Sequence, residues 1–206
     1  MRKLKSKADE AKKRKRNQIV VGVLLIFVML FSTLGFAFNG GGNDEEGQEN
    51  ANYNGFEFIA QNGYWFLELG NYVFVFSNSP EKEIDLEVEG EIKLLNNYLG
   101  RPLYIYSENE ISSYEIYRNM FSETNQVIQR VQNACLNRSD FNLSLCSDDF
   151  PIKTCEDNFI WIKESEENII TQVENCVIIE GEIEKLPQIT DEFLFRTIGI
   201  KKPLVS

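Results

Sequence analysis

The chain has 206 residues, of which 43% are hydrophobic, and its 32 acidic and 21 basic residues give a formal net charge of −11. This length suits one domain with a proper hydrophobic core. The acidic excess argues against nucleic acid as a partner, because phosphate groups repel it. Histidine is absent, which excludes the commonest general base, the commonest metal ligand and every nucleophile that histidine activates.

The N-terminal part of the chain predicts a membrane anchor. Residues 1–17 hold nine basic and two acidic residues, and an uncharged run of twenty residues follows from Ile19 to Phe38. Twenty helical residues span roughly 30 Å, which matches the hydrocarbon core of a bilayer. A cleaved signal peptide and a buried core helix are the alternatives, but the first usually has a shorter apolar run and the second a polar face.

Basic residues beside a membrane span stay in the cytoplasm. We therefore expect a cytoplasmic stub at residues 1–17 and a single-pass signal-anchor helix at 18–38 in the cell membrane. Residues 39–54 are rich in glycine, asparagine and acids and predict a flexible acidic tether. Residues 55–206 predict one extracytoplasmic α+β domain, with an antiparallel or mixed sheet, a long covering helix and a C-terminal helix.

The domain is expected to open with a β-meander over residues 56–76. Aromatic and aliphatic residues fill three runs that two turns separate. Asn62-Gly63 is the preferred sequence of a tight hairpin turn, because both positions need positive φ. The many aromatic side chains favour cross-strand packing over a ligand-stacking platform.

Between residues 84 and 106 the pattern changes twice. Ile84, Leu86 and Val88 alternate with acids and predict a short strand with one acidic face. Apolar residues at helical spacing then predict a short helix ending at Gly100, and residues 103–106 predict a buried strand.

A long helix is predicted from Asn109 or Glu110 to Ala134. An apolar stripe at alternating spacings of three and four supports it. A stripe this broad favours packing on a sheet, and a coiled-coil seam to a partner is the alternative. Its members are Tyr114, Tyr117, Phe121, Thr124, Ile128, Val131 and Cys135.

The following segment is a polar loop over residues 137–147. Asn137 and Asn142 each begin an Asn-X-Ser acceptor sequence for N-glycosylation. So many asparagines occur in the chain that chance alone produces about two such matches. The loop and its expected extracytoplasmic location nevertheless make both asparagines candidates.

The C-terminal third predicts strands and a closing helix. Residues 159–162 form one expected strand, and residues 169–179 form one or two more after a turn. The helix is expected over residues 191–198, with Thr190 as its N-cap and with Asp191 and Glu192 at its positive N-terminus.

All four cysteines lie in the expected extracytoplasmic domain, where an even number predicts two disulfides. Four cysteines allow three pairings, and we favour Cys135 with Cys146 and Cys155 with Cys176, which close neighbouring loops of about 12 and 22 residues. Each bond would stabilise the fold by roughly 3 kcal/mol. Zinc ligands usually come as close pairs and redox sites as Cys-X-X-Cys, so the spacings disfavour both.

Paired acids are the remaining candidates for acid–base or cation chemistry, because the chain has no phosphate-binding loop, nucleophile elbow, zinc-protease motif or EF-hand. We expect these pairs to be solvated, since acids in loops face water and adjacent strand residues point to opposite faces. We therefore predict no catalytic residue, metal site or cofactor. The pairs are Asp148-Asp149, Glu156-Asp157 and Glu166-Glu167.

Three stretches carry a resemblance to other proteins: FPIKTCED at residues 150–157, NCVIIE at 175–180, and a closing helix that ends Ile198-Gly199-Ile200. They resemble a pattern in small single-pass membrane-anchored proteins of archaea, which have no known activity. The resemblance implies the single-pass topology and a bond between Cys155 and Cys176. It transfers no catalytic residue, and the other two cysteines lie outside the pattern.

Three functions fit these features. The anchor, the tether and the missing catalytic groups favour an extracytoplasmic binding or assembly module with a protein partner, such as an accessory subunit of an envelope complex. A carboxylate- or cation-dependent enzyme acting on envelope polymers would need a cleft with two converging acids. A thiol–disulfide protein would need an exposed, easily reduced cysteine pair.

Overall fold

The computed structural model describes residues 50–122 and 125–201. The predicted stub at 1–17, the predicted span at 18–38 and residues 39–49 of the predicted tether lie outside this part of the chain. Within it, no helix combines the length and the apolarity that crossing a membrane requires.

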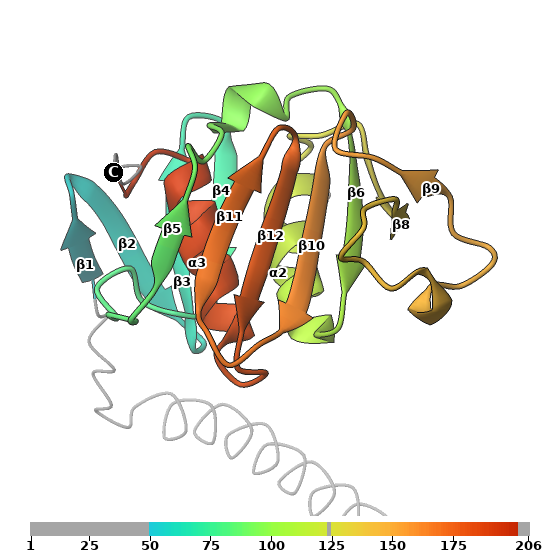
Figure 1. The fold of residues 1–206 in the computed structure, drawn as a ribbon. Coiled ribbons are helices and arrows are strands. Elements are labelled where there is room, and N and C mark those ends of the chain that lie inside the picture. The colour runs from blue at the N-terminus through green and yellow to red at the C-terminus, as the bar shows by residue number, and fades with distance from the viewer. Residues whose placement is uncertain (1–49, 123–124, 202–206) are drawn as a thin grey trace, which may run out of the picture. The chain divides into compact units, whose positions relative to one another are not determined.

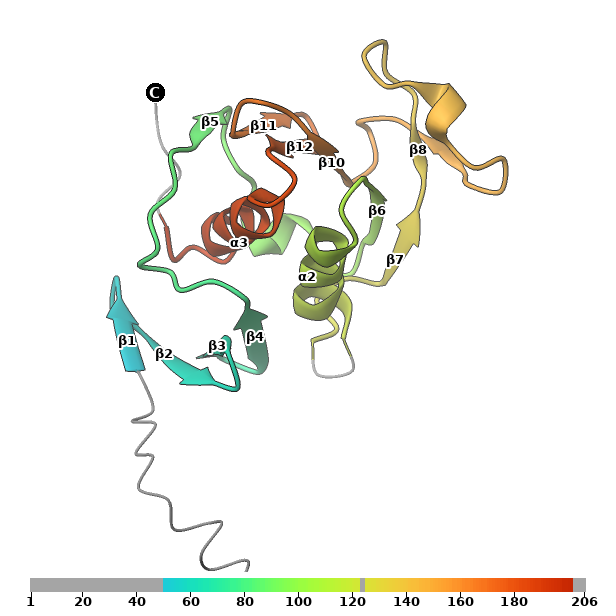
Figure 2. The ribbon, with the colours of Figure 1, turned by 90° about the horizontal axis from the view of Figure 1, so that it is seen from below.

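The described domain has three layers. Figure 2 shows helices α2 and α3 between a four-stranded sheet and a six-stranded sheet. The main hydrophobic core takes residues from every layer: Phe58 and Phe74 from the smaller sheet, Phe193 from α3, and Ile160 and Val177 from the larger sheet. The predicted α+β class with a mixed sheet is confirmed.

The four-stranded sheet is the predicted meander, extended by one strand. All neighbours are antiparallel, and Asn62 and Gly63 have the positive φ that a tight hairpin turn needs. The tether prediction is wrong for residues 50–54, because these residues form the first strand and a second turn of the same kind. The strands are β1 (Asn50–Tyr53), β2 (Phe56–Gln61), β3 (Tyr64–Leu69) and β4 (Tyr72–Phe76).

The six-stranded sheet has the order β5-β11-β12-β10-β6-β7. Figure 1 shows it from β5 to β6, and Figure 2 shows β7 beside β6. β6, β7, β10 and β12 are parallel to one another, β11 is antiparallel to β12, and β5 is parallel to β11. The predicted strands at 103–106 and 159–162 are confirmed, and the one or two strands expected over 169–179 are two, the second of which extends to Gly181. The strands are β5 (Glu87–Glu89), β6 (Pro102–Ser107), β7 (Arg130–Asn133), β10 (Phe159–Glu164), β11 (Ile169–Val173) and β12 (Cys176–Gly181).

The segment before β6 differs from its prediction. The short acidic strand begins at Glu87, later than expected. The helix predicted up to Gly100 is only a single 3-10 turn, η1 (Leu95–Asn97), although Gly100 has the expected positive φ. Buried Ile92 and Tyr98 anchor this segment to the core without a longer helix.

Helix α2 (Glu110–Phe121) ends far before the predicted Ala134. Beyond the helix the side-chain oxygen of buried Asn125 accepts a hydrogen bond from the backbone N of Val73, at 2.9 Å. This contact holds the chain in a turn, after which β7 begins. The predicted long helix is wrong because valine and isoleucine in this stretch suit a strand at least as well as a helix.

Helix α3 (Leu186–Thr197) begins earlier than predicted. Thr190 is not its N-cap: the Thr190 hydroxyl donates to the carbonyl oxygen of Leu186, one turn earlier, at 2.8 Å. Asp191 and Glu192 lie in the middle of the helix and are buried. The helix lies between two sheets, so ten of its twelve residues are buried and the usual polar face is missing.

The remaining segment, residues 134–158, forms a cap on the outer face of the larger sheet. It contains β8 (Cys135–Leu136), η2 (Leu143–Leu145) and β9 (Ile152–Lys153), and β8 pairs with β9. A second hydrophobic cluster lies beneath it, where Leu136 and Phe141 of the cap pack with Phe159, Trp161 and Ile178 of the sheet.

Candidate functional site

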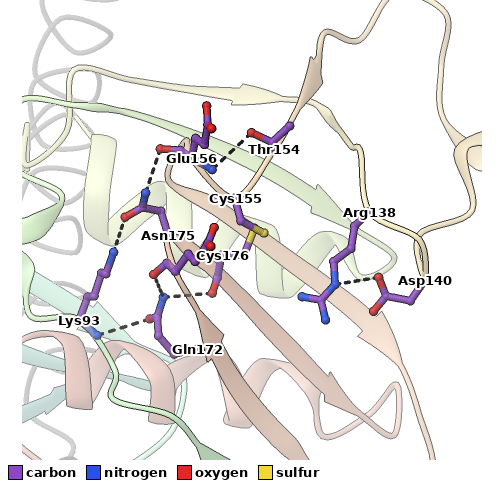
Figure 3. Close-up of a disulfide and its surroundings, with 10 residues drawn as sticks. Lys93, Arg138, Asp140, Thr154, Cys155, Glu156, Gln172, Asn175 and Cys176 are labelled. Atoms are coloured by element: carbon purple, nitrogen blue, oxygen red, sulfur yellow. Dashed lines mark hydrogen bonds and ion pairs between the residues drawn. A yellow bond between two sulfur atoms is a disulfide. The ribbon is translucent and has the colours of Figure 1, made fainter.

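The cap carries both disulfides, and they join the cysteines in the favoured pairing. One bond links Cys135 to Cys146 within the cap, with Cα atoms 5.9 Å apart. The other links Cys155 to Cys176 at the start of β12, with Cα atoms 4.9 Å apart, and so ties the cap to the sheet (Figure 3). Cys135 and Cys176 are buried and their partners half-buried, which favours structural over redox roles.

Polar contacts reinforce the attachment at β12. Figure 3 shows Asn175 bridging Lys93 and Glu156: the Asn175 amide donates to the carbonyl oxygen of Glu156 at 2.9 Å, and its oxygen accepts from the Lys93 ammonium group. The Gln172 amide donates to the carbonyl oxygen of Cys176 at 3.0 Å. These contacts connect the segments around the Cys155–Cys176 bond, as in a structural scaffold rather than a ligand site.

Lys153 and Tyr104 make a further contact between the cap and the sheet. The Lys153 Nζ atom lies 4.2 Å from the centre of the Tyr104 ring, and Arg130 donates to the Tyr104 hydroxyl at 3.2 Å. Hydrogen bonds from Lys153 and Arg130 lower the pKa of Tyr104. The contact with Tyr104 in turn raises the pKa of Lys153, with a smaller contribution from Asp157.

The glycosylation candidates lie on the cap surface. Asn137 and Asn142 are both exposed, and the Asn142 side-chain oxygen accepts hydrogen bonds from the Ser144 backbone N at 3.1 Å and from the Ser144 hydroxyl at 2.7 Å. An acceptor asparagine has to be exposed, as both of these are. Glycosylation at both positions stays a prediction.

The three acid pairs are spread over separate loops. Five of their six residues are exposed, and half-buried Asp157 makes an ion pair with Lys153 at 3.5 Å. No group of three metal-ligating residues occurs among residues 50–122 and 125–201. The structure therefore does not bring these pairs together into one site.

The aromatic residues of the meander divide between two faces. Phe58 and Phe76 point into the core, where the Phe76 ring centre lies 4.5 Å from that of Phe195. On the outer face, Phe66 and Ile59 line a shallow groove of 420 Å³ together with acids such as Glu68. Most of the aromatic surface thus serves packing.

Two buried acids that the sequence analysis did not single out as a site meet between the helices and β4. Glu115 of α2 is 1% exposed and accepts hydrogen bonds from Ser77 and Arg118. Asp191 of α3 is fully buried, and one of its oxygens accepts from the backbone N and the side-chain amide of Asn78, both at 2.9 Å. The other Asp191 oxygen has no hydrogen-bond partner among the described residues.

Burial raises the pKa of Asp191 well above its usual value, and the negative charge of Glu115 raises it further. The hydrogen bonds from Asn78 and the charge of Arg118 act in the opposite direction but are weaker. Two neighbouring acids, one of which has a raised pKa, resemble a catalytic pair. Both side chains are, however, buried, so neither is open to a substrate in this conformation.

A groove between α2 and β7 has a different character. It has a volume of 290 Å³ and is open to solvent. Tyr114 and Tyr117 of α2 form one wall, with 58% and 43% of their surfaces exposed, while Val131 and Asn133 of β7 form the other. Tyr114 and Tyr117 begin the stripe that was expected to cover a sheet, but in α2 the neighbouring Ile116 and Met120 face the core in their place.

The groove runs beside the free edge of the larger sheet. β7 pairs with β6 on one side, and no described strand pairs with it on the other. Exposed aromatic side chains next to an unpaired strand edge are the features of a surface that another polypeptide covers. The stripe was visible in the sequence, but the sequence did not show that the neighbouring Ile116 and Met120 would pack on the core and leave Tyr114 and Tyr117 exposed.

Comparison with known protein families, curated proteins and solved structures finds no match to this chain.

Proposed function

We propose that this protein is a membrane-anchored extracytoplasmic module that binds or assembles with a protein partner. The groove between α2 and β7 is the observation that carries the proposal. It combines an exposed aromatic stripe with an unpaired strand edge, and these are the elements by which proteins bind extended segments or neighbouring sheets.

The proposed location rests on the sequence and is supported by the cysteines. The uncharged run from Ile19 to Phe38 and its basic leader predict a single-pass anchor with the domain outside the cytoplasm. Two disulfides within one small domain suit an oxidising compartment. The resemblance to archaeal single-pass membrane proteins agrees with this topology and adds no activity.

An enzyme that uses two carboxylates is the second candidate, because Glu115 and Asp191 meet and the pKa of Asp191 is raised. Their burial favours a structural role: a substrate would need α2 and β4 to separate before it reached either acid. We therefore place function on the open groove.

Co-purification from membranes in mild detergent tests the binding role. The wild-type chain should retain a partner that a Tyr114→Ser/Tyr117→Ser variant loses, while Leu94→Ser, at an equally exposed site away from the groove, retains it. Wild-type protein that purifies alone as a monodisperse monomer would count decisively against a binding module.

Protease added to intact cells tests the location. Cleavage should remove residues after Phe38 and leave the basic leader protected. A domain that resists protease in intact cells but is cleaved after lysis lies in the cytoplasm, and the proposed topology would then be wrong.

A further inference from the structure

Building on this proposed function, we infer that the partner of the groove is a second copy of the same chain, paired antiparallel along β7 about a two-fold axis. Such an interface would join the two larger sheets into one and bring the two α2 helices together on the same face. Closed pairs of this kind are the commonest form of protein assembly.

The backbone of β7 presents the groups that such pairing needs. The backbone N of Ala134 donates to the carbonyl oxygen of Ile105 in β6, at 3.1 Å. Since successive strand residues direct their backbone groups to opposite sides, Val131 and Asn133 direct theirs away from β6. These two residues also line the groove, so the unpaired edge and the aromatic stripe form one continuous surface.

A two-fold axis at Gln132 gives the outward backbone N–H and C=O groups of Val131 and Asn133 hydrogen-bond partners. Val131 of each copy then faces Asn133 of the other, and each facing pair exchanges two backbone hydrogen bonds, as in an ordinary antiparallel ladder. Gln132 directs its backbone groups to β6 and is not disturbed. No residue between Arg130 and Asn133 is a proline or an acid that would oppose the pairing.

The charges at the two ends of β7 are opposite. Glu108 and Glu110 lie at the end where β6 leads into α2, and Arg101 and Arg130 lie at the other end, where β6 and β7 begin. An antiparallel second copy therefore places the acidic end of each edge against the basic end of the other.

Of the two edges of the larger sheet, the β7 edge is the one where a second copy would meet less electrostatic repulsion. The opposite edge strand, β5, carries exposed Glu87 and Glu89 and continues a run of exposed acids that begins at Glu81. Two β5 edges would oppose like charges, whereas two β7 edges do not. An anchor in a common bilayer would further favour self-association, because it raises the local concentration of copies.

Photo-crosslinking of the full chain in its own membranes tests the inference. A photoreactive phenylalanine analogue at Tyr117 should give a covalent dimer of the chain. The same analogue at Leu94, which is 48% exposed and does not line the groove, should not. A product between this chain and a different protein, without a dimer, would overturn the inference while leaving the binding role intact.

Matched proline variants then test the edge itself. Val131→Pro removes a backbone N–H of β7 that points away from the sheet. Val88→Pro does the same at β5: the backbone N–H of Glu87 donates to Asn168, so the backbone N–H of the next residue, Val88, points away from the sheet. With the analogue at Tyr117, Val131→Pro should reduce the dimer yield about tenfold, and Val88→Pro should not. Equal yields in the two variants, measured on chains with equal melting temperatures, would overturn the pairing along β7.

Discussion

The two helices of the middle layer have the same length but opposite surroundings. Helix α3 is enclosed by both sheets, and its charged residues Asp191, Glu192 and Arg196 are buried along with its apolar ones. Helix α2 packs on the core through one face and presents Ile111, Tyr114 and Tyr117 to solvent. We therefore expect α3 to contribute more to stability, and the proposed binding role rests on α2, since an exposed apolar stripe contributes little to the isolated fold.

The largest expected effect is the loss of a core contact of α3. Phe195 is buried, and its ring meets Phe76 and Phe58 at centre distances of 4.5 Å and 6.0 Å. Phe195→Ala should lower the free energy of unfolding by about 3–5 kcal/mol, because it leaves a cavity between layers. Chemical denaturation followed by tryptophan fluorescence measures this loss, and Tyr117→Ala of α2 is the matched aromatic control. Similar losses in both variants would remove the distinction between the helices.

A smaller loss is expected where α2 does contact the other layers. Glu115→Ala should lower the free energy of unfolding by about 2–3 kcal/mol, because it leaves the largely buried Arg118 guanidinium group without its carboxylate and the Ser77 hydroxyl without its acceptor. Glu110→Ala, at the exposed start of the same helix, should change it by less than about 0.5 kcal/mol. If both substitutions proved equally mild, the contact between Glu115 and β4 would not hold the layers together.

Asp191 makes the stability contribution of α3 depend on pH. Its pKa is raised in the folded state, so the folded chain holds this proton more tightly than the unfolded chain does. The free energy of unfolding should therefore fall as pH rises above about 3.9, the pKa of an unperturbed aspartate, by up to about 1.4 kcal/mol per pH unit until the folded-state pKa is reached.

Asp191→Asn tests this dependence. An asparagine oxygen can still accept the two hydrogen bonds from Asn78, and the substitution removes the titration. Relative to the wild type, the variant should gain stability as pH rises, measured by denaturation from about pH 4 to pH 8. Parallel curves for the two proteins would mean that Asp191 is ionised at no net cost in the folded state.

The parts of the fold that local rules determine could be predicted from the sequence. The meander follows from alternation and from turns such as Asn62-Gly63, and the cysteine pairing follows from short neighbouring loops. β1 was not predicted, because its composition resembles that of a linker, although Asn54-Gly55 is the same turn sequence as Asn62-Gly63. Most strands of the larger sheet were visible as runs of apolar residues, such as residues 159–162, but β7 was predicted as part of a helix.

The candidate site could not be predicted in the same way, because it depends on contacts between distant segments. The end of α2 is fixed by Asn125, whose partner Val73 lies in the meander. Had the helix continued to Ala134, β7 and the groove beside it would not exist. The burial of Asp191 likewise requires two sheets around one helix, which no local pattern in α3 indicates.

The smallest expected change in stability belongs to the exposed stripe of α2. Tyr114→Ser/Tyr117→Ser should alter the free energy of unfolding by less than about 1 kcal/mol, because about half of each side chain is already exposed to water. The same variant should nevertheless lose most of the crosslinked dimer, since the rings would be buried only in the assembly. Each membrane preparation is divided in two: crosslinking is measured in the membranes, and denaturation is measured after extraction into detergent. If the variant unfolds much more readily, the tyrosines support the fold of one copy. The two helices would then differ only in how much each contributes to stability.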